Sequence, residues 1–451
     1  MSNTSNMINK SLWLSELGER KSRSKLHGAV DSDVVIVGGG IAGISTLYFL
    51  LTQTQLNIIL LESDRIAHGA TGNNAGHALT GFERDFRELV RDYNRESVVS
   101  MYKELNTSWS LLELMNHELK IPTEVTQIVD HGGFTQTDDL LETIQEQYEL
   151  VINGVNHSLI LVSKDFRDRD KIPPQYLDIV EFVEPGEILS RLETLDERYI
   201  AAHIYGPSAL MISAEFTHNI LEMLEQKFPH RLEVYEHTPA EQIKLFPNAV
   251  QIDTPHGNVS ANTLIMCTNG YKQANIIDGN SGQEYLKIKT QISQIMGEVV
   301  AFPSKKQSYF GGYYLNPEHD LHKESYLYIN RRKLKDGLYY TAIGGAELGT
   351  DIHGPYSDNH SLSQESLEKY QRFLKSTKYD FERSEFAYHW EGIMGYTPNR
   401  IRWIGPDTKY PNLYYNLGCN GIGLMQSIYG GWKLAGMLDG AKFSPSLFDP
   451  N

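Results

Sequence analysis

A glycine-rich turn between two apolar segments carries the clearest chemistry in the sequence. Val34–Val37 is a short β-branched run, Ile41–Leu51 is a longer apolar stretch, and the turn between them reads Gly38-Gly39-Gly40-Ile41-Ala42-Gly43. After a polar connection, Asn57–Leu61 is a second apolar run that ends in Glu62. Strand, glycine turn, helix and strand in this order make one compact βαβ unit. A GxGxxG turn in this position predicts that the chain binds a dinucleotide.

The glycines and the acidic residue have separate physical roles in such a site. Gly38 permits the tight turn, Gly40 lets the backbone approach a pyrophosphate at the helix N-terminus, and Gly43 lets the helix lie close to its strand. Glu62 lies about 20 residues beyond the turn, where its carboxylate can accept hydrogen bonds from ribose hydroxyls. This fingerprint leaves FAD and NAD open, because both pyrophosphates make the same demand on the turn.

Other segments decide between the two cofactors. A glycine-punctuated loop, Ser63–His77, follows Glu62 directly, and Cys267–Tyr271 closes a buried strand in the middle of the chain. The C-terminal part contains Trp390–Asn399, then Ile404–Pro406, then Gly418–Leu424. Together these segments resemble the FAD-dependent D-amino acid oxidase superfamily, in the branch with glycine oxidase, sarcosine oxidase, D-amino acid dehydrogenase and gamma-glutamylputrescine oxidase. The resemblance runs from about residue 30 to about residue 440.

The resemblance implies an FAD site drawn from six parts of the chain. The loop after Glu62 would follow the pyrophosphate and the flavin edge, the segment around residue 240 would lie near the adenine, and the C-terminal glycine motif would pass the pyrimidine end of the flavin. The implied cofactor-binding residues are Gly38, Gly39, Gly40, Ile41, Ala42, Gly43, Glu62, Ser63, Gly69, Ala70, Thr71, Asn73, Asn74, Ala75, Gly76, His77, Ala240, Thr268, Asn269, Gly270, Gly395, Gly418, Asn420, Gly421, Ile422, Gly423 and Leu424.

The family's chemistry is hydride transfer from a carbon that bears nitrogen to the flavin, followed by hydrolysis of the imine. The resemblance therefore implies an FAD-dependent oxidase or dehydrogenase that acts on a small amine or amino acid. Its flavin would be reoxidised by an acceptor that the sequence does not specify, either oxygen or a quinone. This chemistry depends mainly on positioning and electrostatics, so it needs no metal cluster or catalytic dyad.

Candidate catalytic residues follow from the same resemblance. Arg331 ends a strand that is similar to the glycine oxidase strand whose terminal arginine grips the substrate carboxylate. The alternative is a surface arginine in a basic cluster, and the neighbouring Arg332 leaves open which of the two faces the substrate. If Arg331 faces the flavin, an amino acid is favoured; otherwise a polyamine or another amine without a carboxylate is favoured. His77 and Tyr396 are further catalytic candidates, and Tyr328 is another, although aromatic residues in strands more often belong to the core.

Two departures from the family predict that FAD is held without a covalent bond. Gly392 stands where monomeric sarcosine oxidase has its flavin-linking cysteine, and Asn73 stands where dimethylglycine dehydrogenase relatives have a linking histidine. A third departure is Asn399, which follows Thr-Pro where the family often has Asp.

The elements around these motifs predict an α/β fold with two interleaved domains. We expect a discontinuous, Rossmann-like FAD-binding domain over residues 30–110, 205–285 and 390–445, and an α+β substrate domain with a mostly antiparallel sheet over 111–204 and 286–389. Residues 1–29 are expected to form a solvated N-terminal arm. Helices are expected at Glu96–Leu119, Leu141–Ile152, Glu215–Phe228 and Leu424–Leu438. In the last of these, Gly430, Gly431, Ala435 and Gly436 allow close backbone packing. Hairpins are expected around Pro255-His256-Gly257-Asn258 and Lys335-Asp336-Gly337.

Composition excludes several other classes of protein. A formal net charge of -16 over 451 residues opposes binding to a nucleic acid backbone. No apolar run is long enough for a membrane span and no signal peptide precedes the first strand, so a cytoplasmic protein is expected. Cys267 and Cys419 form no metal-binding or disulfide pattern, and His319 and His322 suggest an exposed loop rather than metal ligands. Two alternatives remain open: a relative with structural FAD that acts as an assembly factor, and a tRNA-modifying flavin enzyme.

Overall fold

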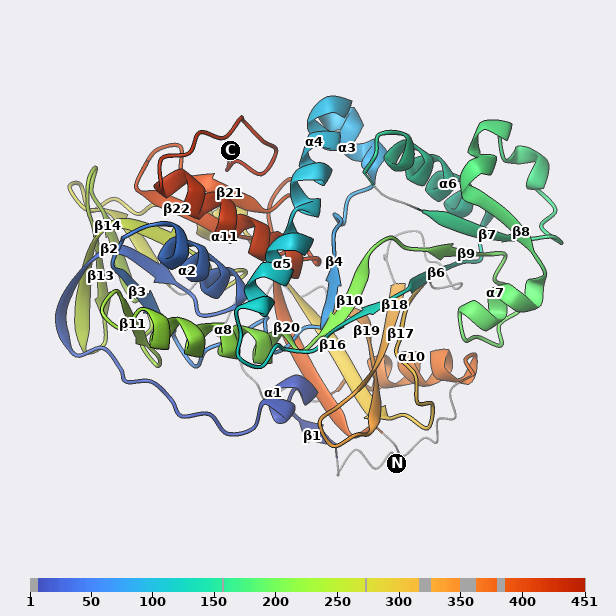
Figure 1. Cartoon of the computed structure of the whole chain (residues 1–451), viewed down its shortest axis with the longest axis horizontal. Helices are drawn as coiled ribbons and strands as arrows, with labels where there is room; N and C mark the ends of the chain where they lie inside the picture. The colour runs from blue at the N-terminus through green and yellow to red at the C-terminus, as the bar shows by residue number, and fades with distance from the viewer. Residues whose placement is uncertain are drawn as a thin grey trace.

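A computed structural model describes residues 7–155, 158–271, 274–315, 326–348, 362–378 and 386–450. His319 and His322 lie outside the described residues. Figure 1 shows a first sheet at the left of the molecule and a second, larger sheet at the right, with helices on the outer faces of both. The mixed α/β architecture that the sequence predicts is confirmed.

The first sheet has a parallel centre in the order β11-β3-β2-β14-β22. Its strands come from widely separated parts of the chain: β2 (Gly28–Val37), β3 (Ile58–Leu61), β11 (Leu232–Tyr235), β14 (Gly257–Met266) and β22 (Leu413–Leu417). The central parts of β2, β3 and β14, at residues 34–37, 58–61 and 264–266, are buried on both faces, and there the sequence is continuously apolar rather than alternating. The sheet is completed by β12 (Gln242–Leu245), β13 (Val250–Thr254), β15 (Asn275–Asp278) and β21 (Trp403–Pro406).

Helix α2 (Ile41–Gln53) is buried along almost its whole length, which is why its sequence is apolar on every side. It is covered by α8 (Ser213–Lys227) and α11 (Leu424–Leu438). A Cβ atom on Gly431 of α11 would lie 2.6 Å from the backbone of Ser45, so the two helices touch backbone to backbone. The close approach that the glycines of the last helix predict is therefore confirmed.

The second sheet has ten strands in the order β1-β20-β16-β19-β18-β17-β6-β9-β7-β8, and most neighbours in it are antiparallel. The expected hairpin around residues 335–337 joins its strands β18 and β19. The bounds of its strands are β1 Ile8–Asn9, β6 Asp130–Phe134, β7 Leu159–Ser163, β8 Val180–Val183, β9 Ala201–Ile204, β16 Ser293–Pro303, β17 Phe310–Leu315, β18 Tyr326–Lys333, β19 Tyr339–Leu348 and β20 Tyr388–Tyr396.

A small antiparallel sheet, β4-β10-β5, connects the two larger ones. Its strands are β4 (His77–Leu79), β10 (Ser208–Met211) and β5 (Val125–Ile128). The helix expected over residues 96–119 is two helices, α4 (Arg95–Asn106) and α5 (Ser108–His117). The remaining helices are α1 Leu12–Leu17, α3 Phe86–Asp92, α6 Thr137–Ile152, α7 Pro185–Arg191, α9 Lys287–Gln291 and α10 Gln364–Lys375, with 3-10 turns at Arg169–Lys171 and Pro174–Ile179.

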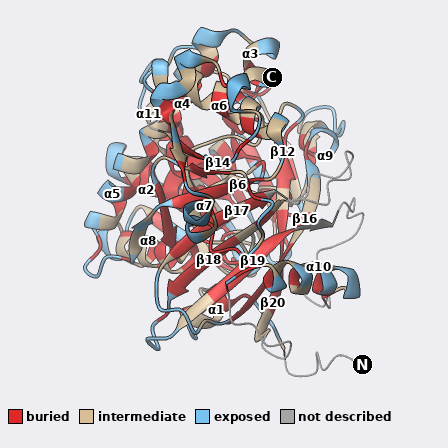
Figure 2. Ribbon diagram, turned by 90° about the vertical axis from the view of Figure 1, so that its right-hand side faces the viewer, coloured by how far each residue is buried: buried red, intermediate tan, exposed pale blue. Residues whose placement is uncertain are grey.

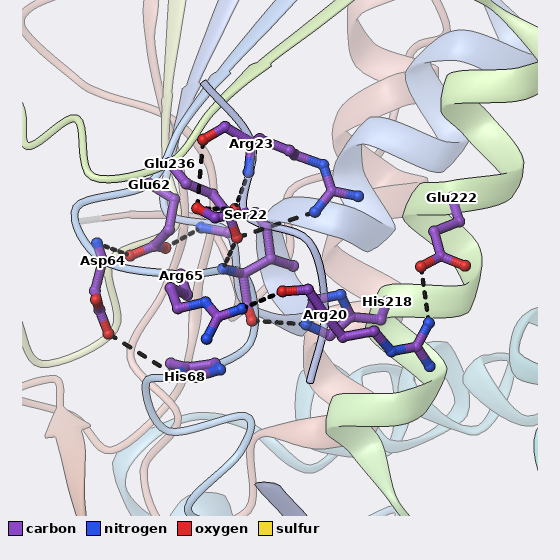
Figure 3. Close-up of polar contacts among 12 residues, drawn as sticks. Arg20, Ser22, Arg23, Glu62, Asp64, Arg65, His68, His218, Glu222 and Glu236 are labelled. Atoms are coloured by element: carbon purple, nitrogen blue, oxygen red, sulfur yellow. Dashed lines mark hydrogen bonds and ion pairs between the residues drawn. The ribbon is translucent and has the colours of Figure 1, made fainter. Parts of the chain in front are cut away.

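From residue 7 on, the N-terminal segment is not a solvated arm, and the expectation of such an arm is corrected for residues 7–29. Leu12 and Trp13 of α1 are almost fully buried, and the indole of Trp13 donates to the carbonyl of Asn74 at 2.7 Å. The basic stretch that follows is bound by acidic partners: Arg20 pairs with Glu222 at 2.8 Å, and the backbone amide of residue 23 donates to the buried Glu236 at 2.5 Å (Figure 3). Trp13 and Ser11 attach this segment to the glycine loop after β3.

The core follows the sheets. In Figure 2 the strands are mostly buried, whereas α3, α5 and α10 carry exposed faces. In the described part of the chain, none of the helices combines the length and the apolar character that a membrane crossing needs.

Candidate active site

One cavity of about 1420 Å³ lies between the first sheet and the ten-stranded second sheet. At one end it is lined by the turn after β2, by Glu62 and by the segment around Ala240; at the other end it is lined by side chains of β4, β17 and β18. Its volume exceeds the usual range for a single small ligand, which leaves room for a cofactor and a substrate together.

We call the end of the cavity at the glycine turn the nucleotide end, because the sequence predicts a dinucleotide there. It is built around Glu62, at the carboxyl end of β3. One carboxylate oxygen accepts from the backbone amide of Gly39 at 2.7 Å, and the other accepts from the amide of Asp64 at 2.9 Å and the hydroxyl of Ser63 at 3.1 Å. Burial raises the pKa of Glu62. A half-buried carboxylate that already holds the glycine turn is suited to accept further hydrogen bonds from ribose hydroxyls.

The glycine turn has no room for side chains at two of its positions, Gly38 and Gly40. Gly38 has φ 112°, and a Cβ atom there would lie 2.6 Å from the carbonyl oxygen of Cys267. Gly40 is the N-cap of α2 and gives it no side-chain cap, while Thr71 Oγ1 accepts from the amide of Ile41 at 2.9 Å. The N-terminus of α2 therefore opens onto the cavity with its positive dipole end, which is what a pyrophosphate requires.

The structure brings most of the predicted cofactor residues to the cavity wall. Those that line it are Gly38, Gly40, Ile41, Ala42, Glu62, Ser63, Gly69, Ala70, Thr71, Asn73, Asn74, Ala75, Gly76, His77, Ala240, Thr268, Asn269, Gly421, Ile422, Gly423 and Leu424. Two buried polar atoms on the wall, Thr268 Oγ1 and Trp390 Nε1, have no hydrogen-bond partner among the described residues. Orphaned buried polar groups at a cavity surface fit a polar ligand such as FAD.

Other predicted residues support the wall from behind. A Cβ atom on Gly43 would lie 1.9 Å from the carbonyl oxygen of Gly38, so this glycine sets the contact between helix and turn. Gly395 similarly allows contact with the amide of Gly270, at 2.6 Å from its would-be Cβ. The residues that do not themselves line the cavity are Gly39, Gly43, Gly270, Gly395, Gly418 and Asn420.

The C-terminal glycine motif is held in place by two asparagine side chains. Asn269 Oδ1 accepts from the amide of Cys419 at 3.0 Å, and Asn420 Oδ1 accepts from the amide of Thr397 at 2.8 Å. Directly after this motif, α11 begins at Leu424 without a side-chain cap, and its first residues line the cavity. A second helix N-terminus therefore opens onto the same cavity and favours negative charge there.

The positions that bear on covalent attachment lie side by side. Gly392 lines the cavity, and a Cβ atom on it would lie 2.5 Å from the carbonyl oxygen of Asn73. Cys267 and Cys419 also line the cavity, but burial raises the pKa of Cys267 to about 12 and raises that of Cys419 as well. Both thiols are therefore protonated at neutral pH, whereas attack on a flavin requires a thiolate.

The other end of the cavity, which we call the substrate end, is lined by His77 and a group of tyrosines. His77 Nδ1 lies 3.2 Å from the hydroxyl of Tyr313, and His77 Nε2 lies 3.5 Å from Oδ1 of the fully buried Asp130. Burial lowers the pKa of His77, against an opposing effect of Asp130. The imidazole is therefore neutral at neutral pH.

Sequence reasoning missed most of this end. Asp130, His203, Tyr205, Tyr313 and Tyr326 were not among the candidates, although His77 and Tyr328 were. The alternation of Tyr326 and Tyr328 along one strand was the available signal, but the same spacing is typical of a core strand.

The expected role of Arg331 is corrected by its position. Side chains of β18 alternate between two faces: Tyr326 and Tyr328 line the cavity, whereas Arg331 lies on the opposite face. There its guanidinium pairs with Glu193 at 2.9 and 3.0 Å and donates to the carbonyl of Ser308 at 2.6 Å. Arg331 therefore connects β18 to the segments after α7 and before β17, and it does not line the cavity.

Arg332 and Tyr396 do not line the cavity either. Arg332 lies on the cavity-side face of β18, but its guanidinium donates to the carbonyl of Gly76 at 3.0 Å and stacks on the ring of Trp13, 4.7 Å from the centroid. The buried Tyr396 has its hydroxyl 3.9 Å from the sulfur of Met394. The catalytic assignment of Tyr396 is corrected for this reason.

One group of described side chains has spacing suited to a metal ion. Ligand atoms of Glu298, His389 and Glu391 lie within 4.8 Å of one another, and all three residues are buried. His389 Nε2 lies 3.5 Å from a carboxylate oxygen of Glu298, and Ser366 donates a hydrogen bond to the other oxygen. We interpret the group as a polar link between neighbouring strands β16 and β20.

Comparisons with known proteins agree on the type of fold. A model of the family DAO, described as FAD dependent oxidoreductase, matches residues 33–437. The gamma-glutamylputrescine oxidoreductase of Escherichia coli is 31% identical over 72 residues, which are 16% of this chain and 17% of that protein. The probable oxidoreductase OrdL of Haemophilus influenzae is 25% identical over 89 residues, or 20% of each chain. Both alignments thus span a fifth or less of the curated relatives.

Solved structures match over nearly the whole chain. Glycine oxidase from Geobacillus kaustophilus has a TM-score of 0.68 at 15% identity, covering 93% of this chain and 98% of that one. NikD, an amino acid oxidase of nikkomycin biosynthesis, has a TM-score of 0.66 at 12% identity, with 93% and 97% covered. L-proline dehydrogenase from P. horikoshii has a TM-score of 0.63 at 15% identity, with 92% and 94% covered. At these identities the likeness establishes the fold.

Proposed function

The chain belongs to the DAO family of FAD-dependent oxidoreductases, and from this premise we propose that it oxidises the C–N bond of a small amine or amino acid. Hydride would pass from the carbon that bears nitrogen to the flavin, and the imine would hydrolyse to a carbonyl compound. The observation that carries the proposal is the single cavity, which joins the glycine turn and Glu62 at one end to His77 and the tyrosines at the other.

The residues at the nucleotide end would hold FAD in three ways. The turn at residues 38–43 and the N-terminus of α2 would bind the pyrophosphate, Glu62 would accept from the ribose, and the loop after Gly418 would contact the flavin. When bound, FAD supplies an acceptor for a hydride. The N-terminus of α11 favours the negative charge that such a reduction produces, because the dipole is fixed there before the reaction.

His77 and Tyr313 are placed to remove a proton from the substrate amine, which must be uncharged before it can give up a hydride. We propose that the Tyr313 hydroxyl donates its proton to His77 Nδ1, 3.2 Å away, as it receives the ammonium proton. Asp130 would then stabilise the imidazolium from 3.5 Å. His77→Gln should therefore lower kcat at neutral pH and recover part of it at higher pH, where the free amine is abundant.

The proposal is tested by product analysis. Because the natural acceptor is unknown, the holoprotein is incubated with a redox dye and, in turn, with glycine, sarcosine, D-amino acids and polyamines. The expected result is a carbonyl product and a released amine or ammonia in equal amounts from one class. A holoprotein that forms no carbonyl compound from any class would favour the alternative of a structural FAD in an assembly factor.

The other alternative, a tRNA-modifying flavin enzyme, is opposed by the net charge of -16. It predicts binding of tRNA that weakens steeply with salt, which a filter-binding titration measures.

Non-covalent attachment of FAD has its own test: acid precipitation of the holoprotein should leave the yellow flavin in the supernatant. Flavin that stays in the pellet would contradict the reading of Gly392 and Asn73.

A further inference from the structure

The substrate end of the cavity has a wall of aromatic rings. Six side chains form a continuous chain of neighbours, with ring centroids between 4.1 Å (His203 to Tyr205) and 6.4 Å (Tyr313 to Tyr328) apart. They come from strands β4, β17 and β18 and from the end of β9, and all of them line the cavity. We call this surface the aromatic wall; it consists of His77, His203, Tyr205, Tyr313, Tyr326 and Tyr328.

A buried carboxylate lies behind the aromatic wall. Asp130 is fully buried at the start of β6, and neither of its oxygens accepts a hydrogen bond from a described residue. Gly311 makes the space for it, since a Cβ atom there would lie 1.7 Å from Oδ1. The nearest basic group is His77, which is neutral because burial lowers its pKa. The neutral imidazole therefore gives Asp130 no cationic partner.

This charge acts on the rings of the wall. Burial raises the pKa of Tyr205 and Tyr313, and Asp130 adds to the effect on both; Glu146 adds to that on Tyr205. Glu146 lines the cavity on α6, where burial and then Asp85 raise its pKa to about 7. Asp130 and Glu146 are thus the acidic groups that act on the tyrosines of the wall, and Arg332 acts on His77 with the opposite sign.

The described arginines near this end have partners of their own. Arg331 pairs with Glu193 on the far face of β18, and Arg332 donates to the Gly76 carbonyl and stacks on an indole. Arg87 lines the cavity and pairs with Glu142 at 3.3 Å. A guanidinium clamp for a substrate carboxylate would need a pair of parallel donors that faces the cavity. Arg331 and Arg332 do not line the cavity, and Arg87 pairs with Glu142.

We propose that the aromatic wall binds an organic ammonium ion whose reacting carbon carries no carboxylate, with the ammonium held over the ring faces and Asp130 behind them. The inference rests on the proposed function, because it names the substrate class of the same site. Ring faces attract cations, and the attraction is stronger when the contact is desolvated. A carboxylate placed there would meet the like charge of Asp130 and lose its water without compensation.

The wild-type holoprotein tests this without turnover. Tetramethylammonium chloride and sodium acetate, at matched ionic strength, are titrated separately against the oxidised protein, and the change in the visible flavin spectrum is followed. The expected result is a saturable change with tetramethylammonium and none with acetate. A saturable change with acetate, or none with tetramethylammonium, would overturn the inference.

Variants locate the binding site. Tyr313→Leu and Asp130→Asn should each weaken tetramethylammonium binding about tenfold or more, as loss of about 1.4 kcal/mol implies, whereas Tyr313→Phe, which keeps the ring, should bind within about threefold of wild type. Tyr339→Leu, a half-buried strand tyrosine outside the cavity lining, is the matched control. Equal affinity in folded, flavin-loaded Tyr313→Leu and wild type would contradict the aromatic wall as the site.

The two proposals fail separately. Binding of tetramethylammonium by a protein that oxidises no amine would contradict the proposed oxidation and leave the cation site intact. Oxidation of glycine or D-amino acids, together with competition by acetate, would support the oxidation and overturn the cation site.

Discussion

Replacing Glu62 with glutamine tests the cofactor site at its most constrained side chain. The carboxylate accepts the Gly39 amide at 2.7 Å as well as the amide of Asp64 and the hydroxyl of Ser63. Glutamine keeps the size but turns one acceptor oxygen into a donor, which then faces either a backbone N–H or a ribose hydroxyl. A hydrogen bond to a charged group contributes about 1.5–3 kcal/mol. A loss of about 2 kcal/mol corresponds to FAD binding weakened about 30-fold.

The assay is a titration of the apoprotein with FAD, followed by quenching of flavin fluorescence. It is run at mildly alkaline pH, because burial raises the pKa of Glu62 and the charged form must be compared. Glu187→Gln, on the exposed surface of α7, removes the same charge away from the cavity and serves as control. An FAD Kd for folded Glu62→Gln within about threefold of wild type would refute the role of this carboxylate.

Three further predictions concern stability. Gly431→Ala should lower stability by about 1–3 kcal/mol in thermal unfolding, because its Cβ would lie 2.6 Å from the α2 backbone. The control is Gly186→Ala, whose Cβ meets nothing within 4 Å and which should leave stability unchanged. Equal Tm values for Gly431→Ala and wild type would contradict the close helix contact. Burial lowers the pKa of His218 to about 4, so the unfolded chain takes up more protons than the folded one and stability is lost as pH falls from about 6.5 toward 4. Between pH 7.5 and pH 5, His218→Gln should therefore lose about 2 kcal/mol less stability than wild type in denaturant titrations. An identical loss in both proteins would refute this. Arg331→Met should destabilise by about 3 kcal/mol, because the buried Glu193 keeps only its ion pair with Lys306. Unchanged stability with a raised substrate KM would instead return Arg331 to the substrate site.

The nucleotide end was predictable because its signals are local. The turn at residues 38–43 and Glu62 belong to one βαβ unit, in which strand, helix and strand succeed one another and spacing alone fixes the contacts. The glycines of α11 were also readable, since a helix with Gly430 and Gly431 on one turn can approach another backbone closely.

The substrate end was not predictable for two physical reasons. The aromatic wall gathers rings from strands β4, β9, β17 and β18, which lie far apart in sequence, and their pairing depends on the order of the whole sheet. The direction of Arg331 depends on strand register, because a shift by one residue moves a side chain to the other face. With arginines at both 331 and 332, no local pattern distinguishes the two faces.

The N-terminal segment shows a third limit. Leu12 and Trp13 are buried against strands β16, β19 and β20, and the Trp13 indole donates to the carbonyl of Asn74 in the loop after β3. In the sequence they stand in a short apolar stretch between polar residues. Burial of so short a helix depends on the groove that receives it, and the sequence of the segment does not describe that groove.

The most direct test of the account is the visible absorption spectrum of the purified protein under anaerobic conditions, before and after addition of an amine. The account predicts a flavin spectrum that is bleached by an ammonium compound without a carboxylate on its reacting carbon, with one carbonyl product formed per flavin reduced. A flavin spectrum that no amine or amino acid changes, or a folded protein that binds no flavin, would contradict it.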